Sequence, residues 1–499
     1  MTKNYYITTP IYYVNDAPHI GHAYTSIACD VLARFKRLDG YRVKFLTGTD
    51  EHGQKIEKSA NKAGIPPQQF VDKYAETFRS LGKIFNFSND DFIRTSEERH
   101  KETVRAIWQK LVDSGSIYLG KYSGWYAVRD EAFYNESELI NGKAPTGADV
   151  EWLEEPSYFF NLSAWQDRLL AFYEKNPGFI APESKRNEVI SFVKGGLHDL
   201  SVSRTSFNWG IHVPGDEKHV IYVWLDALFN YYSAINTDDE HDLWPCDLHI
   251  LGKDILRFHA VYWPAFLMAA KMELPKRVFA HGWWTNEGVK MSKSLGNALD
   301  PIKMVEEFGL DFVRYFLMRE MPFGNDGSYS KGLFIQRINA ELCNNIGNLV
   351  QRVLSFINKN CGAVVPANSA LNDTDKNLLN QAYATIEKMR LHIDEQALQS
   401  AFEEVIKLGS LANEYIDHQA PWNLRKTDPV RMEAVLYTLC ECIRCIGIML
   451  QPIIPDSAAK VLDLLAVKER DFAALNASYA LVPGTSLPAP GVVFPRIVD

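Results

Sequence analysis

Residues 4–53 decide the fold class of this chain, and they read NYYITTPIYYVNDAPHIGHAYTSIACDVLARFKRLDGYRVKFLTGTDEHG. The first six of them, residues 4–9, are rich in Tyr, Ile and Thr, which predicts a strand. After a turn at Gly21, apolar side chains recur every four residues as far as Gly40, which indicates a helix. Residues 41–46 predict a second strand. This β-α-β order is typical of a doubly wound α/β domain, which binds ligands at the carboxyl ends of its strands.

The rest of the chain divides by its sequence character. Strand-like sequence returns at residues 220–225 and 248–252, whereas aromatic and turn residues dominate from about residue 118 to 209. After about residue 330, apolar residues recur with helical spacing, and the stretch from residue 480 carries four prolines. We therefore expect a doubly wound α/β domain that is split by a small insertion and followed by an α-helical bundle with an extended tail.

Composition excludes several classes of protein. The 499 residues are 46% hydrophobic and 23% charged, which is typical of a globular protein and not of a disordered or collagen-like one. We expect no secretory signal, because the N-terminus has no basic segment followed by an apolar run. We expect no membrane partner, because the longest nearly apolar stretch, residues 260–270, is too short to span a bilayer. Seven cysteines, an odd number, argue against a disulfide framework and predict a cytoplasmic location. Since the net charge is −9, any surface that binds nucleic acid must be local.

The segment PHIGH, residues 18–22, lies where the first predicted helix begins. A helix N-terminus offers backbone N–H groups without intrahelical partners and a partial positive charge. With two histidines and a glycine that allows close approach, the segment could bind triphosphate oxygens. On the residues alone, a pair of surface histidines at a turn is the alternative.

A second motif, KMSKS at residues 290–294, lies between Gly288 and Gly296. Two lysines on a glycine-bounded loop could neutralise the charge of a leaving pyrophosphate, and a solvated basic loop is the alternative. One specified pentapeptide occurs by chance in a chain of this length with a probability of about 10⁻⁴, so the match is informative.

Together, on a split α/β domain, the two motifs resemble the signature pair of the class I aminoacyl-tRNA synthetases. Further segments narrow the resemblance to the methionyl-tRNA synthetases of bacterial or organellar type, and it extends over nearly the whole chain. These segments are PIYYVN at 10–15, GTDEHG at 48–53, YVWLDA at 222–227, GKDI at 252–255 and FH at 258–259.

The resemblance implies a methionine–tRNA ligase, which activates L-methionine with ATP, brought with Mg²⁺, and transfers methionyl from the adenylate to the 3′ end of tRNA(Met). It also implies a Rossmann-type catalytic domain, a connective insertion and an anticodon-binding bundle. The expected segments are 1–116 (first half of the catalytic domain), 117–216 (connective insertion), 217–275 (second half), 276–335 (linking region with KMSKS) and 336–499 (anticodon-binding helices and tail).

The resemblance assigns roles to individual residues as well. Those expected in catalysis are His19, His22, Lys290 and Lys293. Those expected to bind ATP are His19, Gly21, His22, Gly252, Asp254, Lys290 and Lys293. Those expected to bind methionine are Ile11, Tyr12, Asp50, Trp224, Ala227, Tyr231, Phe258, His259 and Trp263. A carboxylate can pair with the substrate ammonium, and aromatic rings pack well against a thioether sulfur. On the residues alone, the aromatics are also typical of an ordinary core, and Asp254 of a cap at a strand end.

In the helical region, the resemblance implies that Asn348, Arg352 and Trp422 bind the anticodon. Asn348 and Arg352 are spaced i, i+4 and share one helix face. Trp422 matches an aromatic on which an anticodon base stacks, and single-stranded loops are commonly read by stacking. Without the resemblance, Asn348 and Arg352 are typical of a solvated helix face.

Many members of the family carry a zinc knuckle in the insertion, and we expect none in this chain. The ligand pairs expected there read AVRD at residues 127–130 and APTG at residues 144–147. A structural zinc site needs four ligands in tetrahedral array, and among these positions only Asp130 could supply one. No cysteine lies between Cys29 and Cys246. We therefore expect no metal site, and an insertion held by packing.

Three other functions stay open at this point. A small-molecule nucleotidylyltransferase can use a similar histidine turn but does not need a helical bundle. A nucleic-acid-binding relative without activity does not need both motifs. A class I synthetase for another aliphatic amino acid, such as leucine, carries a much larger editing insertion. The partners we expect are tRNA(Met), L-methionine and ATP, and we expect a monomer because no appended tRNA-binding domain follows the bundle.

Overall fold

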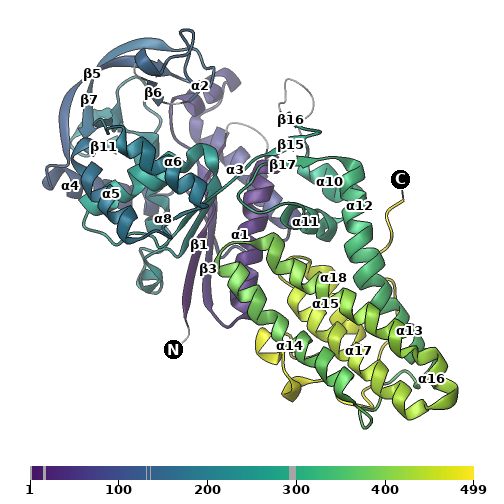
Figure 1. Cartoon of the computed structure of the whole chain (residues 1–499). Helices are drawn as coiled ribbons and strands as arrows, with labels where there is room; N and C mark the ends of the chain where they lie inside the picture. Colours follow the sequence, from purple (N-terminus) through teal and green to yellow (C-terminus); the bar gives the residue numbers. More distant parts are fainter. Residues whose placement is uncertain (1–2, 15–17, 131, 135, 292–298, 499) are drawn as a thin grey trace. The chain divides into compact units, whose positions relative to one another are not determined.

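The computed structural model divides the chain into two compact units (Figure 1). It describes residues 3–14, 18–130, 132–134, 136–291 and 299–498. The sheet unit comprises Tyr5–Pro18 and Lys44–His281, and the bundle unit comprises Met1–Asn4, His19–Val43 and Gly282–Asp499. The first helix of the chain therefore belongs to the bundle unit, although in sequence it connects strands of the sheet unit.

A parallel sheet forms the centre of the sheet unit. Its strands follow the order β2-β3-β1-β13-β14-β8, with β4 beside β3. They are β1 (Asn4–Thr8), β2 (Tyr12–Tyr13), β3 (Arg42–Asp50), β4 (Asp91–Arg94), β8 (Ile180–Ala181), β13 (Leu248–Gly252) and β14 (Val278–His281). The pairs β1–β13, β13–β14, β14–β8, β2–β3 and β3–β4 are parallel. The α/β class predicted from the sequence is confirmed.

The central strands are buried over most of their length because both faces of a parallel sheet are covered. Tyr6, Leu46 and Leu251 are fully buried in one cluster with Trp108 and Trp263. The helices of this unit are α2 (Gln54–Ala63), α3 (Pro67–Ile84), α4 (Glu98–Asp113), α5 (Gln166–Lys175), α6 (Glu183–Lys194), α7 (Val223–Leu228), α8 (Asn230–Ser233) and α9 (Trp263–Ala269).

Antiparallel sheets occupy much of the range 117–216 that the sequence assigned to the insertion. One joins β6 (Ala132–Tyr134), β5 (Ile117–Ala127), β7 (Glu151–Phe160) and β9 (Leu200–Ser201). Another joins β10 (Ser203–Arg204), β12 (Asp216–Ile221) and β11 (His212–Val213). Strand β8 lies in the same range, yet it pairs with β14 of the parallel sheet. The boundaries of the insertion stay a proposal, because this range also supplies an edge strand of the main sheet.

The strand predicted over residues 220–225 is wrong in its second half and in its sheet. Strand β12 ends at Ile221 and pairs antiparallel with β10 and β11, and helix α7 begins at Val223. A short, almost wholly apolar run has no periodicity that separates a buried strand from a buried helix, so tertiary contacts decide. The strands predicted at 41–46 and 248–252 are present as β3 and β13.

Helices dominate the bundle unit, as predicted for the chain after about residue 330. Helix α1 (Ile20–Leu38) comes first, and Gly40 follows it with a positive φ of 82°. A small sheet contains β15 (Trp284–Asn286), β16 (Val289–Lys290) and β17 (Gly327–Tyr329). The remaining helices are α10 (Pro301–Phe308), α11 (Leu310–Arg319), α12 (Lys331–Ile338), α13 (Asn348–Asn360), α14 (Asp373–Asp394), α15 (Leu398–Gln419), α16 (Pro421–Thr427), α17 (Pro429–Leu450) and α18 (Pro455–Leu464).

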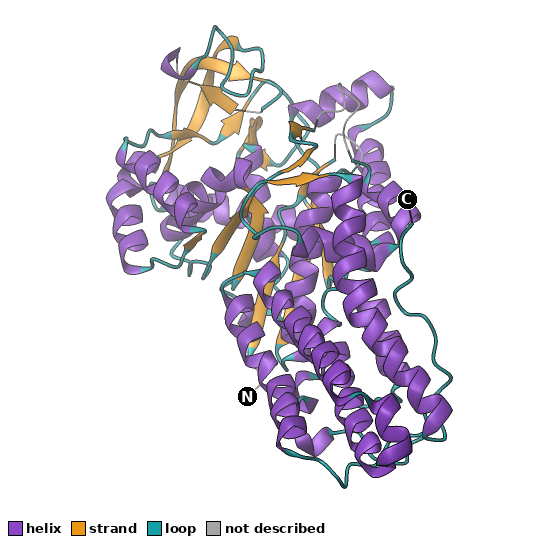
Figure 2. Cartoon of the chain, turned by 45° about the vertical axis from the view of Figure 1, so that its right-hand side comes forward, coloured by secondary structure: helices purple, strands orange, loops and turns teal. Residues whose placement is uncertain are grey.

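Helix α17 supplies much of the core of the bundle. Figure 1 shows it alongside α14 and α15, and Figure 2 shows the helices of this unit in purple. Within this helix Glu441 and Arg444 are buried as an ion pair, with 2.6 Å between Oε1 and Nη2, and Tyr383 donates to the same carboxylate at 2.9 Å. Pairing and hydrogen bonding let the helix bury these two charges. None of the described helices combines the length and apolar character needed to cross a membrane.

Candidate active site

The histidine turn lies at the start of α1, in the bundle unit. His19 caps the helix, since the backbone N–H of Gly21 donates to its Nδ1 at 3.1 Å. His22 Nδ1 accepts from the backbone N–H of His19, also at 3.1 Å, and the two rings stack with centroids 3.8 Å apart. A Cβ on Gly21 would lie 2.9 Å from the His19 ring, so this position favours glycine. The histidines therefore order a helix N-terminus, which is suited to an anion.

The second motif begins on the small sheet of the same unit. Lys290 is the last residue of β16, and its backbone pairs with Thr285 of β15. The adjacent Trp284 meets Tyr24 of α1 edge-on, with ring centroids 5.8 Å apart. This contact brings the hairpin that leads into the second motif against the helix that carries the first. Lys293 falls within residues 292–298, outside the residues that the structure describes.

In the sheet unit, several predicted residues gather at the carboxyl edge of the parallel sheet. Strand β3 ends at Asp50 and β13 ends at Gly252, while Ile11 directly precedes β2, in which Tyr13 pairs with Asp50. Asp254 follows β13 in a short 3₁₀ turn. A Cβ on Gly252 would lie 2.6 Å from Asp254 Oδ1, so the glycine lets this carboxylate fold back over the strand end.

An aromatic cluster occupies the same unit. Trp224 and Phe258 stack with ring centroids 3.6 Å apart and 5° between their planes. Trp263 is fully buried, and its ring centroid lies 5.9 Å from that of Tyr231. Ile11 and Trp224 are partly buried and pack against the large cluster that contains Trp263 and Tyr231. The structure therefore brings most of the predicted methionine residues together.

Two of the predicted residues differ from this group. Ala227 is buried on α7 close in sequence to Trp224, with little side chain of its own. The Tyr12 ring stacks on Phe78, with 5.6 Å between centroids, in a separate apolar cluster to which β2, α2 and α3 contribute. For Tyr12, a role of the ring in the core is what the contacts support.

Tyr231 and His259 form a polar pair inside the aromatic cluster. The Tyr231 hydroxyl lies 2.7 Å from His259 Nε2, and His259 Nδ1 lies 3.0 Å from the Ile255 carbonyl. Since a carbonyl only accepts, Nδ1 carries the hydrogen and Nε2 accepts from the tyrosine. Burial lowers the pKa of His259 to about 4, against smaller opposing effects of the Ile255 carbonyl and Asp254. The imidazole is therefore neutral at pH 7.

A buried carboxylate between two histidines was not predicted from the sequence. Asp226 Oδ2 lies 2.6 Å from His52 Nδ1, and its Oδ1 lies 2.7 Å from His100 Nε2. Burial acts to raise the pKa of Asp226, but the two imidazoles lower it to about 2. Asp226 and His52 stand inside the segments YVWLDA and GTDEHG, but no local spacing could link positions so distant in sequence.

His249 on β13 is a second residue that the sequence did not reveal. Its Nδ1 lies 2.7 Å from Thr8 Oγ1, and its Nε2 accepts from the Trp263 indole N–H at 3.3 Å. Burial lowers the pKa of His249, so the ring is a neutral bridge between β1 and the aromatic cluster. In the sequence, His249 is distinguished only as the polar residue of a strand that is otherwise apolar.

In the bundle unit, α13 and α16 bring together Arg352 and Trp422. The Arg352 guanidinium lies 5.6 Å from the centre of the Trp422 ring, and its Nη2 lies 2.7 Å from Asp417 Oδ1. The Trp422 side chain is 41% exposed. Asn348, the first residue of α13, is exposed one helical turn before Arg352. An exposed indole beside a guanidinium is suited to stacking with a nucleobase.

Comparisons with known proteins cover the whole chain. The family model described as tRNA synthetases class I (M) matches residues 5–150 and 136–354, and the anticodon binding domain of methionyl tRNA ligase matches residues 365–499. The methionine–tRNA ligase of Rickettsia felis is 60% identical over 99% of this chain and 99% of the relative. That of Brucella suis is 56% identical over 100% and 98%, respectively. The chain belongs to the methionyl-tRNA synthetase family.

A solved structure from the same family matches the fold. It is Mycobacterium tuberculosis methionyl-tRNA synthetase in complex with methionyl-adenylate, 50% identical with a TM-score of 0.96 over 99% of this chain and 100% of that chain. The methionyl-tRNA synthetase resemblance inferred from the sequence is therefore confirmed, as is the order of an α/β domain followed by a helical anticodon-binding domain.

The zinc knuckle of many methionyl-tRNA synthetases does not fit this chain. The four expected ligand positions hold Ala127, Asp130, Ala144 and Gly147. The two alanines belong to a small apolar cluster. The Asp130 carboxylate accepts hydrogen bonds from the hydroxyls of Thr146 and Tyr134. Among the described residues, no group of three or more His, Cys, Asp or Glu side chains could hold a metal ion.

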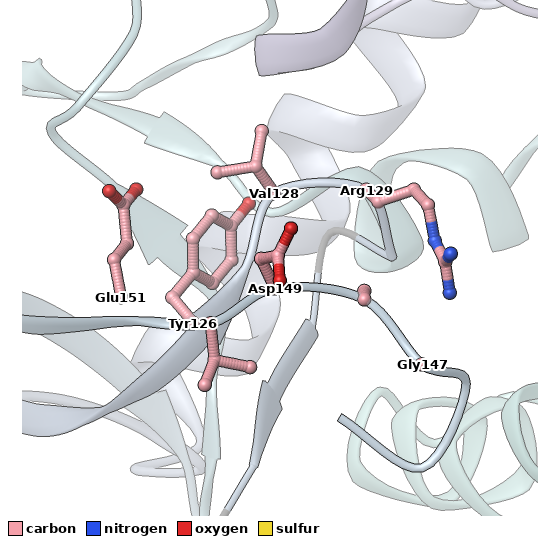
Figure 3. A pocket seen from close by; sticks show the side chains of 8 residues that line it. Tyr126, Val128, Arg129, Gly147, Asp149 and Glu151 are labelled. Carbon is pink, nitrogen blue, oxygen red and sulfur yellow. The ribbon is translucent and has the colours of Figure 1, made fainter. Parts of the chain in front are cut away.

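An open cavity of about 440 Å³ lies beside this part of the insertion (Figure 3). Its lining residues are Tyr126, Val128, Arg129, Gly147, Ala148, Asp149, Val150 and Glu151. None of the residues expected to bind methionine, ATP or tRNA lines it, so this cavity is separate from the candidate active site.

Proposed function

We propose that this chain is a methionine–tRNA ligase, which makes methionyl-adenylate and transfers its methionyl group to tRNA(Met). The observation that carries the proposal is the full-length likeness to a synthetase solved with methionyl-adenylate. The neutral Tyr231–His259 pair beside the Trp224–Phe258 stack supports the same substrate, because a thioether packs well against aromatic rings and carries no charge.

In the proposed activation step, a carboxylate oxygen of methionine attacks the α-phosphorus of ATP. The bond from that phosphorus to the bridging oxygen breaks, and pyrophosphate leaves with the electron pair. ATP enters as its Mg²⁺ complex, held by the residues His19, Gly21, His22, Gly252 and Asp254. Lys290 and Lys293 neutralise the charge that grows on the leaving pyrophosphate. Such a reaction needs positioning and electrostatic stabilisation, and no nucleophile of the protein.

The proposed methionine site joins a charged end and an apolar end. Asp50 pairs with the substrate ammonium. Trp224, Phe258 and Trp263 surround the thioether, with Ile11 and Ala227 completing the site. The His259 ring stays neutral because it is buried, which keeps a positive charge away from the apolar end.

In the proposed transfer step, a hydroxyl of the terminal ribose of tRNA attacks the methionyl carbonyl carbon, and AMP leaves. Asn348, Arg352 and Trp422 recognise the anticodon by base-edge contacts and stacking. The pairing of Arg352 with Asp417 and Trp422 supports this role, because it fixes the guanidinium beside an exposed ring.

We propose further that the enzyme needs no zinc, acts as a monomer and resides in the cytoplasm. The hydroxyl partners of Asp130 support the first point. The seven cysteines all lie in the described part of the chain and none is in a disulfide, which supports a reducing compartment.

Trapping of the intermediate tests the proposal. Purified protein is mixed with methionine and Mg²⁺-ATP in the absence of tRNA, denatured, and analysed by mass spectrometry. Methionyl-adenylate should accumulate in stoichiometric amount while pyrophosphate is released, and none should form without methionine. Release of phosphate or AMP without the mixed anhydride would contradict the assignment.

A further inference from the structure

We propose that Asp226 is a positioning residue of the methionine site, because its carboxylate joins helix α7 to the end of strand β3. The inference rests on the proposed function and extends it to residues that neither signature motif contains. Asp226 is fully buried and contacts two imidazoles from distant parts of the sequence.

Both contacts have the geometry of charge-assisted hydrogen bonds. His52 Nδ1 lies 2.6 Å from Asp226 Oδ2, and His100 Nε2 lies 2.7 Å from Oδ1. An ionised carboxylate only accepts, so each imidazole donates to it. His52 follows β3 and His100 belongs to α4, so one side chain of α7 binds two other segments of the sheet unit.

Each imidazole is itself held in place. Ser233 Oγ donates to the Phe229 carbonyl at 2.8 Å, and its oxygen lies 3.0 Å from His100 Nδ1. The His52 ring meets Trp209 edge-on, with centroids 5.5 Å apart. Since both rings are fixed, the position of Asp226, and with it that of α7, is fixed as well.

The sequence neighbours of Asp226 and His52 connect the cluster to the proposed methionine site. Asp226 stands between Trp224 and Ala227 on α7, which we assign to the thioether end of the site. His52 stands two positions after Asp50, which we assign to the ammonium end. The pair His52–Asp226 therefore sets the spacing between the two ends of the bound amino acid.

A second anchor acts on the same strand end. Glu51, between Asp50 and His52, receives two hydrogen bonds from Arg94, at 2.7 and 2.9 Å. The end of β3 is thus fixed by Glu51 on one side and by His52 on the other. A core that needed only stability could use apolar side chains instead of a buried charge cluster, which supports a role in positioning.

Asp226→Asn tests the proposal. The amide keeps the shape but has a single acceptor oxygen, so one imidazole loses its acceptor. In methionine-dependent ATP–pyrophosphate exchange, the KM for methionine should rise about tenfold to a hundredfold, the scale of one hydrogen bond to a charged group. The KM for ATP and kcat should stay within about twofold, because the contacts to phosphate are not altered.

Glu441→Gln is the matched control. It makes the same change of carboxylate to amide in a buried ion pair of α17, in the bundle unit. It should lower the thermal unfolding temperature without changing the KM for methionine. This comparison separates a loss of stability from a loss of substrate positioning.

The results that overturn the proposal are specific. They are a folded Asp226→Asn protein with an unchanged methionine KM, an equal rise in the KM for ATP, or the same methionine effect in Glu441→Gln. If Asp226→Asn does not fold, Ser233→Ala perturbs the cluster more gently by removing the hydroxyl beside His100. It should raise the methionine KM by about threefold to tenfold, and no change would overturn the proposal. A failure of the proposed function differs, because the unaltered chain would then show no methionine-dependent exchange.

Discussion

Truncation of Trp422 separates tRNA recognition from amino-acid activation. The side chain is 41% exposed on α16, so Trp422→Ala removes little of the bundle core. It does remove the flat surface on which we propose that an anticodon base stacks. It also removes the ring that lies 5.6 Å from the Arg352 guanidinium.

The expected loss follows from these two contacts. Stacking of a base on an aromatic side chain contributes about 1–3 kcal/mol. The exposed cation–π contact between Arg352 and Trp422, which holds the guanidinium in place, contributes about 0.5–1 kcal/mol more. Together the two contacts contribute about 1.5–4 kcal/mol, so we expect kcat/KM for tRNA in aminoacylation to fall by roughly tenfold to 900-fold. ATP–pyrophosphate exchange with methionine should stay within about twofold, because that reaction needs no tRNA.

Tyr479→Ala serves as the control for this prediction, since Tyr479 is an aromatic side chain of similar exposure, 49%, in the same unit. It should change neither reaction. Equal losses of exchange and aminoacylation in Trp422→Ala would refute the reasoning, because they would mean that Trp422 maintains the fold and does not read the anticodon.

Three further predictions concern phosphate chemistry, acid stability and metal content. Lys293→Ala should slow adenylate formation by about two to three orders of magnitude with little change in the KM for methionine, as rapid-quench kinetics can measure; normal turnover with a weaker methionine KM would contradict this role. The pKa of His259 is about 4 in the folded chain against 6.5 in the unfolded one, so the unfolded state binds the proton first as the pH falls. The free energy of unfolding therefore falls as the pH drops from 6.5 towards 4, by about 2 kcal/mol at pH near 5. Urea unfolding at about pH 7.5 and 5 should thus show a smaller decrease in the free energy of unfolding for His259→Gln than for the parent chain. Equal decreases would argue against a buried neutral imidazole. Elemental analysis should find far less than stoichiometric zinc, and a chelator should leave the fold intact; zinc lost together with activity would disprove the prediction.

Sequence alone predicted those features that local patterns encode. Strand β13 is apolar except for His249, and helix α1 ends shortly before Gly40, which takes a positive φ, so both could be predicted from short stretches. The run that contains Trp224 could not, because an apolar segment of that length suits a strand or a helix equally. Its helical form depends on partners elsewhere in the chain.

The candidate site shows the same division. The aromatic residues of the methionine site stand in motifs, and the structure gathers Trp224, Phe258 and Trp263 in one cluster. The cluster of Asp226 with two histidines could not be predicted, because its members lie on separate elements and only the fold brings them within hydrogen-bonding distance. Similarly, nothing local to the sequence tells that the Tyr12 ring packs on Phe78.

The amino-acid specificity of ATP–pyrophosphate exchange tests the central claim most directly. Purified protein is assayed with Mg²⁺-ATP, labelled pyrophosphate and each of methionine, leucine, isoleucine and valine in turn, without tRNA. The aromatic cluster with its neutral Tyr231–His259 pair predicts fast exchange with methionine and only background exchange with the branched side chains. Exchange with leucine, isoleucine or valine at the rate seen with methionine, or no exchange with methionine, would contradict the account.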